Sequence, residues 1–272
     1  MNSTQHAPQQ AKLTPNLGLK DRNTFGLDAV AELAYEITAA EQIPEVMSKI
    51  TKQKMSWRVL GGGSNVILPN ALAGATLLMN ILGQEILKTD QEATYLSVGG
   101  GVIWHDLVTW TLENDLPGFE NLALIPGTVG AGPIQNIGAY GVEIGEYIDC
   151  IEAFDVKDHA FVTLQKDACR FAYRDSYFKQ HAGRFIVTKV VFKMPKEWKA
   201  RIHYADLAKQ FSADSNPSPE DIFLAVCKIR THKLPDPKVI GNAGSFFQNP
   251  IIPNEQYETL LRTYADLASY QD

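Results

Sequence analysis

The pattern of apolar and polar positions along the chain predicts strands and helices in mixed order. Short apolar or alternating runs bounded by turn residues indicate strands at residues 32–37, 57–60, 95–98, 148–156, 160–164 and 185–192. Apolar residues at helical spacing predict helices at residues 38–50, 103–113, 220–231 and 254–268. Because these elements do not follow a strict βαβ rhythm, we expect an α+β fold.

The first helix start and the length of the chain define the expected organisation. Thr38 and Glu41 have the spacing of a capping box, which would start the first helix. Residues 1–20 are polar and contain Gln and Pro, so we expect a flexible leader there. We expect a first domain at 21–215, divided into subdomains at about 21–85 and 86–215, and a second domain at 216–272.

Composition is that of an ordinary globular protein, with 45% apolar and 21% charged residues. The net charge of −6 argues against broad nucleic-acid binding, which usually needs a basic face. Residues 226–239 are basic, in contrast to the acidic chain as a whole. They carry Lys228, Arg230, Lys233 and Lys238 against only Asp236. Such a basic island fits a small anionic ligand such as a diphosphate, and it equally fits a solvated helix face followed by a turn.

The spacing of the cysteines and the length of the apolar runs indicate the cellular compartment of the protein. The three cysteines lie far apart and show no metal-like pairing with the six histidines, which indicates a reducing compartment and no zinc site. The first twenty residues lack the apolar centre of a signal peptide, and no apolar run is long enough to span a bilayer. We therefore expect a cytoplasmic protein without membrane insertion.

A first glycine loop follows the strand predicted at 57–60. Its residues are Gly61, Gly62, Gly63, Ser64 and Asn65. A dinucleotide-binding Rossmann spacing fails because Val66 stands where the third glycine belongs, and the phosphate-loop pattern with Lys-Ser/Thr is missing as well. What remains is a run of backbone N–H groups with two polar side chains, which suits a pyrophosphate.

A second glycine-rich stretch lies at residues 117–145, after another strand that ends in the triplet Gly99–Gly101. Five of its glycines lie within fifteen residues: Gly127, Gly130, Gly132, Gly138 and Gly141. So many glycines rule out a regular helix or strand interior. Gln135 and Asn136 supply amide groups that can read the edge of a ring system. Two separate glycine loops, neither of Rossmann type, point to a long dinucleotide ligand.

Ser245 stands in the most suggestive short motif, Gly241–Pro250. Two glycines precede it, and carboxamides lie on both sides. Phe246 and Phe247 follow it, and their rings could exclude water. A hydroxyl in such a dry, donor-rich turn suits proton chemistry. The alternative is an ordinary polar turn, which most Gly/Asn/Ser clusters are.

Seven segments match the motifs of a known family in the same order along the chain. They are Asn23–Phe25, Leu60–Val66, Glu120–Gly127, Pro133–Gly141, Tyr173–Ser176, Lys233–Lys238 and Gly241–Pro250. On these segments the chain resembles the UDP-N-acetylenolpyruvoylglucosamine reductases (MurB), flavoenzymes of peptidoglycan synthesis. One segment alone would be a weak signal, whereas the ordered set is highly specific. His203–Leu207 is similar to the tyrosine-bearing loop of the type I subgroup.

The resemblance implies an FAD-binding domain of the vanillyl-alcohol-oxidase type in two subdomains, and a C-terminal substrate-binding domain. The residues that would hold FAD are Gly61, Gly62, Gly63, Ser64, Asn65, Gly127, Thr128, Gly130, Gln135, Asn136, Gly138, Ala139 and Tyr140. Contacts to the nucleotide-sugar substrate would come from Tyr204, Lys233, Asn249 and Arg230. Arg174 and Ser245 would be catalytic.

The reaction that the resemblance implies is NADPH-linked reduction of UDP-N-acetylglucosamine enolpyruvate to UDP-N-acetylmuramate by a cytoplasmic monomer. Hydride passes through FAD to the substrate, and Ser245 protonates the resulting enolate. Arg174 offers paired N–H donors to the charge that builds on the substrate carboxylate. From the residues alone, an ion pair of Arg174 with Asp175 is equally open. Tyr204 could be an interfacial aromatic, and Lys233 a cation at a helix C-terminus.

The chain departs from the family pattern after the Ser245 motif. The family pattern includes a strand-rich segment with a catalytic glutamate, and residues 251–272 contain no match; Glu255 and Glu258 lie on the tail helix. We therefore expect an incomplete second domain, FAD binding with impaired turnover, and exposed apolar residues on the tail helix. An FAD-linked oxidase of the same fold and a non-catalytic flavin-binding module remain the alternatives.

Overall fold

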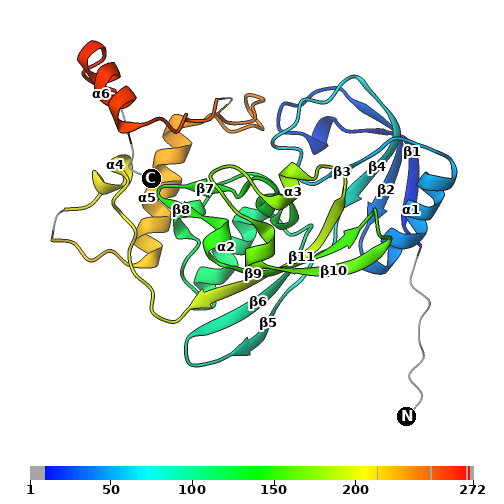
Figure 1. The fold of residues 1–272 in the computed structure, drawn as a ribbon, viewed down its shortest axis with the longest axis horizontal. Coiled ribbons are helices and arrows are strands. Elements are labelled where there is room, and N and C mark those ends of the chain that lie inside the picture. Colours follow the sequence, from blue (N-terminus) through cyan, green and yellow to red (C-terminus); the bar gives the residue numbers. More distant parts are fainter. Residues whose placement is uncertain (1–9, 213, 246, 268, 270–272) are drawn as a thin grey trace.

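The computed structural model describes residues 10–212, 214–245, 247–267 and 269. Two β-sheets lie side by side, and the helices pack on their faces or extend beyond the second sheet (Figure 1). One sheet mixes parallel and antiparallel strands and the other is antiparallel throughout. The predicted α+β class is therefore confirmed.

The N-terminal sheet has the strand order β1-β2-β4-β3. Its strands are β1 (Lys12–Gly18), β2 (Val30–Ile37), β3 (Trp57–Leu60) and β4 (Ala71–Met79). β1 runs antiparallel to β2, whereas β2 and β3 run parallel to β4. Helix α1 (Ile43–Lys52) connects β2 to β3 and buries one apolar face, including Val46 and Met47, against this sheet.

The expectation of a flexible leader at residues 1–20 is wrong for residues 12–18, which form β1. Their backbone pairs with β2 over the full strand, although the side chains stay mostly exposed. An edge strand needs few apolar residues because its ladder hydrogen bonds come from the neighbouring strand, so its sequence signal is weak. Residues 1–9 lie outside the described part of the chain.

The start of the first helical segment also differs from the prediction. The side-chain oxygen of Gln42, rather than that of Glu41, accepts hydrogen bonds from the backbone N–H groups of Thr38 and Ala39. A short 3₁₀ turn at Ala40–Gln42 precedes α1 and shifts the cap by one residue. The predicted box of Thr38 with Glu41 is therefore replaced by a Gln42 cap.

The second sheet has the order β10-β9-β11-β6-β5. Its strands are β5 (Gln84–Thr89), β6 (Ala93–Gly99), β9 (Ile148–Asp155), β10 (Ala160–Gln165) and β11 (Phe185–Pro195). Helix α2 (Trp104–Glu113) packs on one face, where the ring of Phe192 meets the rings of Trp104 and Phe119 edge to face. Phe154 and Ile186 of this sheet join the α1 core, so the two sheets share apolar contacts.

The remaining elements lie around the second sheet and beyond it. They are the hairpin β7 (Gly138–Ala139) and β8 (Val142–Glu143), and helices α3 (Tyr177–Gln180), α4 (Ala205–Ala208), α5 (Pro219–Lys233) and α6 (Asn254–Thr263). α5 packs on the 3₁₀ turn Glu120–Leu122. α6 has no buried residue and extends away from the body (Figure 1), and it ends earlier than the predicted tail helix.

Candidate functional site

The two glycine loops, distant in sequence, pack against each other. A Cβ atom on Gly62 would lie 2.8 Å from the Cα of Gly127, and one on Gly61 would lie 2.5 Å from Oγ1 of Thr128. The hydroxyl of Ser64 donates a hydrogen bond of 3.1 Å to the carbonyl of Pro126. Glycine at 61 and 62 is therefore needed for the close approach of the loops.

The first loop presents unused backbone donors. Within the described part of the chain, the N–H groups of Gly62, Gly63, Ser64 and Asn65 donate no hydrogen bond to the protein. Gly63 takes a left-handed conformation with φ of +61° and lies against the backbone of Arg22 and Asn23. Consecutive N–H groups in such a conformation form a concave donor surface that suits a phosphate or diphosphate.

The triplet Gly99–Gly101 adds a third segment, which sequence reasoning did not assign to the site. The N–H of Gly130 donates to the carbonyl of Gly100 at 2.9 Å, and a Cβ on Gly100 would lie 2.9 Å from the carbonyl oxygen of Val187. The repeat of a strand followed by three glycines was the available signal. It was missed because the two triplets share no flanking sequence.

A cavity of about 130 Å³ opens where the three glycine segments meet the sheets. Its walls include Val59, Gly61, Met79, Gly100, Gly130 and Val187. These walls are mostly apolar, whereas the donor surface of the first loop borders them through Gly61. An apolar cavity beside a phosphate-binding surface is the arrangement that a large cofactor with a ring system and a diphosphate requires.

The side chain of Asn136, a residue expected to hold FAD, is hydrogen-bonded within the protein. Its side-chain N–H groups donate to Oε2 of Glu143 at 2.5 Å and to the carbonyl of Ala172 at 3.1 Å, and its oxygen accepts from the N–H of Gly145. The residue is buried and left-handed, with φ of +46°. Because both donors are used internally, they hold the loop. Gln135 is half-buried, and its side chain has no hydrogen-bond partner among the described residues.

Arg174 lies against the second glycine loop. Its Nη2 donates to the carbonyl of Gly138 at 2.6 Å, and its Nη1 lies 3.8 Å from a carboxylate oxygen of Glu143. The pairing with Asp175 that the sequence left open does not form. Asp175 instead accepts a hydrogen bond from Gln180, the main reason why its pKa lies below the ordinary value. The guanidinium is partly exposed, so it retains donors for a ligand.

Four residues from the expected cofactor and substrate sets form a second cluster. The rings of Tyr140 and Tyr204 meet edge to face, with centroids 5.3 Å apart. Arg230 donates to the carbonyl of Leu124, and its buried Nε has no protein partner among the described residues. Lys233 forms an ion pair with Asp206 of α4.

Burial shifts the pKa values of two residues in this cluster. Burial raises the pKa of the Tyr140 hydroxyl, and the nearby cations Arg230 and Lys233 oppose that rise. Burial also lowers the pKa of Arg230. Two cations that act on one tyrosine, one of them with an unused buried N–H, make a surface that favours an anionic group. This surface would suit the diphosphate expected from the basic island.

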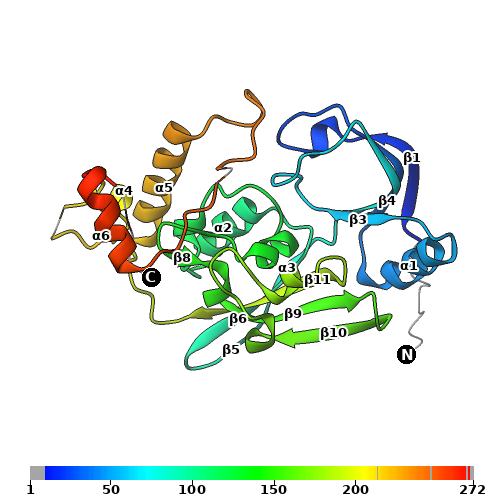
Figure 2. The same ribbon diagram turned by 45° about the horizontal axis from the view of Figure 1, so that its top comes forward.

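The Ser245 segment reaches the first loop through Thr24. The N–H of Asn242 donates to the carbonyl of Thr24 at 3.0 Å, and the N–H of Thr24 donates to the carbonyl of Gly63 at 3.2 Å. A Cβ on Gly241 would lie only 2.2 Å from the carbonyl oxygen of Phe25. In Figure 2 this segment runs from α5 toward the loops of the N-terminal sheet. The contacts explain why the Asn23–Phe25 and Gly241–Pro250 motifs occur together.

The expectation that Ser245 lies in a dry turn is wrong. Ser245 is exposed, its hydroxyl donates to the carbonyl of Phe247, and the Phe247 side chain is 82% exposed. Asn249 is exposed as well, and Phe246 lies outside the described residues. Every described residue from 244 to 250 is exposed because no other element packs over this segment.

Comparison with known proteins gives the family. Residues 31–160 match the FAD binding domain family. A protein of Polynucleobacter asymbioticus named UDP-N-acetylenolpyruvoylglucosamine reductase is 74% identical over the whole chain, which spans 79% of that protein. A protein of the same name from Paraburkholderia phymatum is 43% identical over 97% of the chain and 78% of its own length. The chain belongs to the UDP-N-acetylenolpyruvoylglucosamine reductase family.

A solved structure supports the fold of this reductase-family chain. The UDP-N-acetylenolpyruvylglucosamine reductase (MurB) of Thermus caldophilus superposes with a TM-score of 0.61 at 22% identity, covering 94% of this chain and 80% of the other. With the matched FAD binding domain, this likeness gives the FAD-binding fold of the vanillyl-alcohol-oxidase type. The chain is an oxidoreductase because it belongs to the reductase family. Within the described residues, no helix is both long and apolar enough to cross a bilayer.

FAD, the cofactor of the matched domain family, fits the residues present in this member of the reductase family. The unused N–H groups of residues 62–65 can hold its diphosphate, and the adjoining apolar cavity can take part of the ring system. Thr128 is the polar residue among those that line that cavity, and Gln135 follows Ile134, which also lines it. The side chain of Asn136 is hydrogen-bonded within the protein. Arg174 stands at the Gly138 end of the same loop.

Proposed function

We propose that this chain catalyses the NADPH-linked reduction of UDP-N-acetylglucosamine enolpyruvate to UDP-N-acetylmuramate in the cytoplasm. The observation that carries the proposal is the contact of Tyr140 with Tyr204. This contact places the end of the second glycine loop beside the cationic cluster of Arg230 and Lys233. A flavin held by the loop and a nucleotide sugar held by the cluster would then lie next to each other. The three free cysteines fit the reducing compartment.

Each part of the site has a role in this reaction. The chemistry that FAD supplies when bound is hydride transfer, from NADPH and then to the enolpyruvyl double bond. Arg230 and Lys233 would bind the diphosphate of the nucleotide sugar, and Tyr204 would pack against it. The exposed donors of Arg174 would face the enolpyruvyl carboxylate and stabilise the negative charge that develops there.

Ser245 would deliver the proton that completes the reduction. Its hydroxyl is exposed on a segment that Asn242 ties to Thr24, beside the first glycine loop. A hydroxyl is a poor acid in water, so we infer that bound substrate covers Ser245 before the proton moves. Asn249, four residues along on the same exposed segment, would contact the substrate from that side.

The two half-reactions test this proposal. We expect the purified chain, loaded with FAD, to lose its flavin absorbance with NADPH under anaerobic conditions and to regain it when the enolpyruvyl substrate is added. A protein that cannot be loaded with FAD would contradict the cofactor assignment. Reoxidation by oxygen but not by this substrate would favour an FAD-linked oxidase, and no bleaching by NADPH would favour a non-catalytic flavin-binding module.

The Ser245→Ala variant tests the proton donor. We expect flavin reduction by NADPH to be unchanged and reoxidation by the enolpyruvyl substrate to slow by about 100-fold or more, because a positioned general acid contributes on that scale. Ser245→Cys retains a proton donor and should keep part of the rate. Stopped-flow absorbance measures both steps, and an unchanged reoxidation rate in the Ala variant would exclude this role of Ser245.

A further inference from the structure

Asn121 connects two segments of the candidate site through one side-chain amide. The residue is fully buried in the 3₁₀ turn Glu120–Leu122. Its side-chain nitrogen donates to the carbonyl of Tyr140 at 2.9 Å and to the carbonyl of Arg201 at 2.8 Å. Tyr140 belongs to the second glycine loop, and Arg201 belongs to the segment that leads to Tyr204.

The carbonyl of Tyr140 lies in a strained turn. Tyr140 and Gly141 form the two-residue connection of the β7–β8 hairpin, and both have positive φ, of +49° and +78°. A side chain larger than glycine is disfavoured in this conformation, so the turn needs support from its surroundings. The hydrogen bond from Asn121 gives that support, at the backbone of the residue whose ring meets Tyr204.

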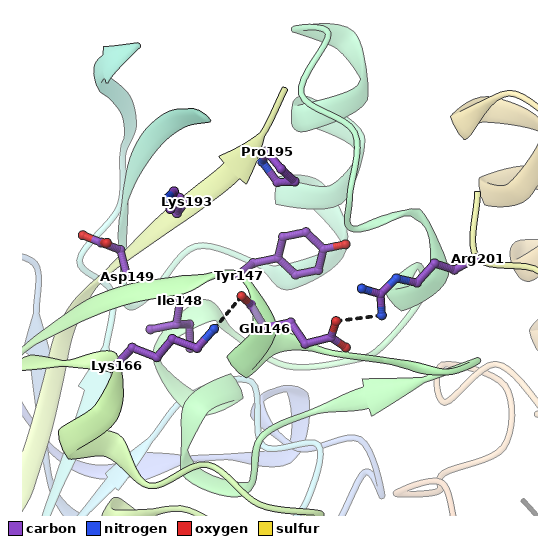
Figure 3. Close-up of a pocket in the computed structure, with 8 residues that line it drawn as sticks. All are labelled: Glu146, Tyr147, Ile148, Asp149, Lys166, Lys193, Pro195 and Arg201. Carbon is purple, nitrogen blue, oxygen red and sulfur yellow. Dashed lines mark hydrogen bonds and ion pairs between the residues drawn. The ribbon is translucent and has the colours of Figure 1, made fainter. Parts of the chain in front are cut away.

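The segment before Tyr204 is held at several points. Nε1 of Trp198 donates to the buried carboxylate of Glu120 at 2.7 Å. The guanidinium of Arg201 pairs with Glu146 at 2.7 Å, at the edge of a cavity of about 300 Å³ (Figure 3). The carbonyl of Arg201 is held by Asn121. Arg201 is thus fixed by its side chain on one side and by its backbone on the other.

We propose that Asn121 is a positioning residue for the nucleotide-sugar substrate, because it sets the place of Tyr204 relative to the flavin loop. Two N–H donors on one planar amide bring both carbonyls to the same nitrogen. Aspartate has the same shape but, when ionised, no donor. The amide oxygen of Asn121 is buried without a protein partner among the described residues, so the donors are the part of this amide that the structure uses.

This inference rests on the proposed function, since it takes Tyr204 as a substrate contact. The probe is UDP-N-acetylglucosamine enolpyruvate, titrated against the FAD-loaded chain without NADPH, with the flavin spectrum as the readout and calorimetry as a second measurement. The variants are Asn121→Asp, Tyr204→Leu and the double variant. Asn114→Ala is the matched control, because it removes an amide-to-carbonyl hydrogen bond at the exposed end of α2.

We expect each single variant to raise the half-saturating substrate concentration about 10-fold, with FAD affinity and the control unchanged. The double variant should show about the same 10-fold change, because Tyr204 is already displaced once Asn121 is altered. Asn121→Asp preserves side-chain volume but places a carboxyl group against two carbonyl oxygens. Asn121→Leu is a second variant of similar size that carries no charge, and the same effect is expected of it.

Several outcomes would overturn the inference. Effects that multiply to about 100-fold in the double variant would mean that Asn121 and Tyr204 act independently. An unchanged titration of Asn121→Asp would exclude the positioning role, and loss of FAD binding in that variant would assign Asn121 to the fold alone. An unchanged titration of Tyr204→Leu would instead refute the substrate role of Tyr204. The failure of the proposed function itself would show differently, as no change of the flavin spectrum when the substrate is added to the wild-type chain.

Discussion

Asp155, at the end of β9, shows how the hydrogen bonds of a single side chain stabilise the fold. Its carboxylate is almost fully buried and accepts two hydrogen bonds from Arg184, of 2.9 and 2.7 Å. The backbone N–H groups of Lys157 and Asp158 donate to its other oxygen. The hydrogen bonds from Arg184 are the largest reason why the pKa of Asp155 lies below its ordinary value of 3.8.

This pKa predicts an acid-dependent loss of stability. Because the folded pKa lies below that of the unfolded chain, the stabilisation is present in full above the unfolded value near 3.8 and is lost as pH falls through the folded pKa. Asp155→Asn should lower the free energy of unfolding by about 2 kcal/mol at pH 7, and by less near pH 3.

Urea unfolding of both proteins at the two pH values measures this difference. Asp175→Asn is the comparison, because Asp175 is a carboxylate whose pKa is lowered mainly by an exposed hydrogen bond from Gln180. A cost of Asp155→Asn that is the same at pH 3 and pH 7 would show that ionisation of Asp155 does not contribute.

At the scale of elements, α5 carries two of the expected substrate contacts, Arg230 and Lys233, near its C-terminal end. Its N-terminus has a complete capping box. The hydroxyl of Ser218 accepts from the N–H of Asp221, and the Asp221 carboxylate accepts from the N–H of Ser218. Pro219 takes the first helical position, where no N–H is needed.

Ser218→Ala should therefore destabilise the chain by about 1 kcal/mol, because one backbone donor of α5 loses its acceptor. Ser218→Thr keeps a capping hydroxyl and should lose much less. Thermal unfolding followed by circular dichroism compares the three proteins. Equal midpoints for the Ala variant and the wild type would mean that the cap adds nothing to the stability of α5.

At the scale of the whole molecule, the site is assembled from loops that are far apart in sequence. Residues 24–25, 61–65, 99–101, 127–130 and 241–242 meet through backbone contacts. Glycine permits these contacts because a side chain would collide with the neighbouring main chain.

Gly62→Ala tests this assembly. Its Cβ would lie 2.8 Å from the Cα of Gly127, so the two glycine loops must separate. We expect FAD affinity to fall about 10-fold or more, measured by flavin fluorescence titration. Gly18→Ala is the matched control, because its Cβ would meet nothing within 4 Å and its φ is not positive. Equal FAD affinity in both variants would contradict the loop packing as the basis of the cofactor site.

Much of the fold followed from local sequence. The strand predicted at 57–60 is β3, and the helix predicted at 220–231 lies within α5, because apolar periodicity and capping residues act over a few neighbours. The β4 strand was missed, although Ala71–Met79 is largely buried. Its continuous apolar run suits a strand with neighbours on both sides, and only the pairing with β2 and β3 shows those neighbours.

The sequence by itself determined the two glycine loops, the ordered motifs and the residue types of the candidate site. Only the tertiary structure decided which of these side chains remain available to contact a ligand. It uses both Asn136 donors internally, pairs Arg174 with the loop rather than with Asp175, and leaves Ser245 exposed. The physical reason is that hydrogen-bond partners and burial come from segments distant in sequence, whereas a motif records only the residues beside it.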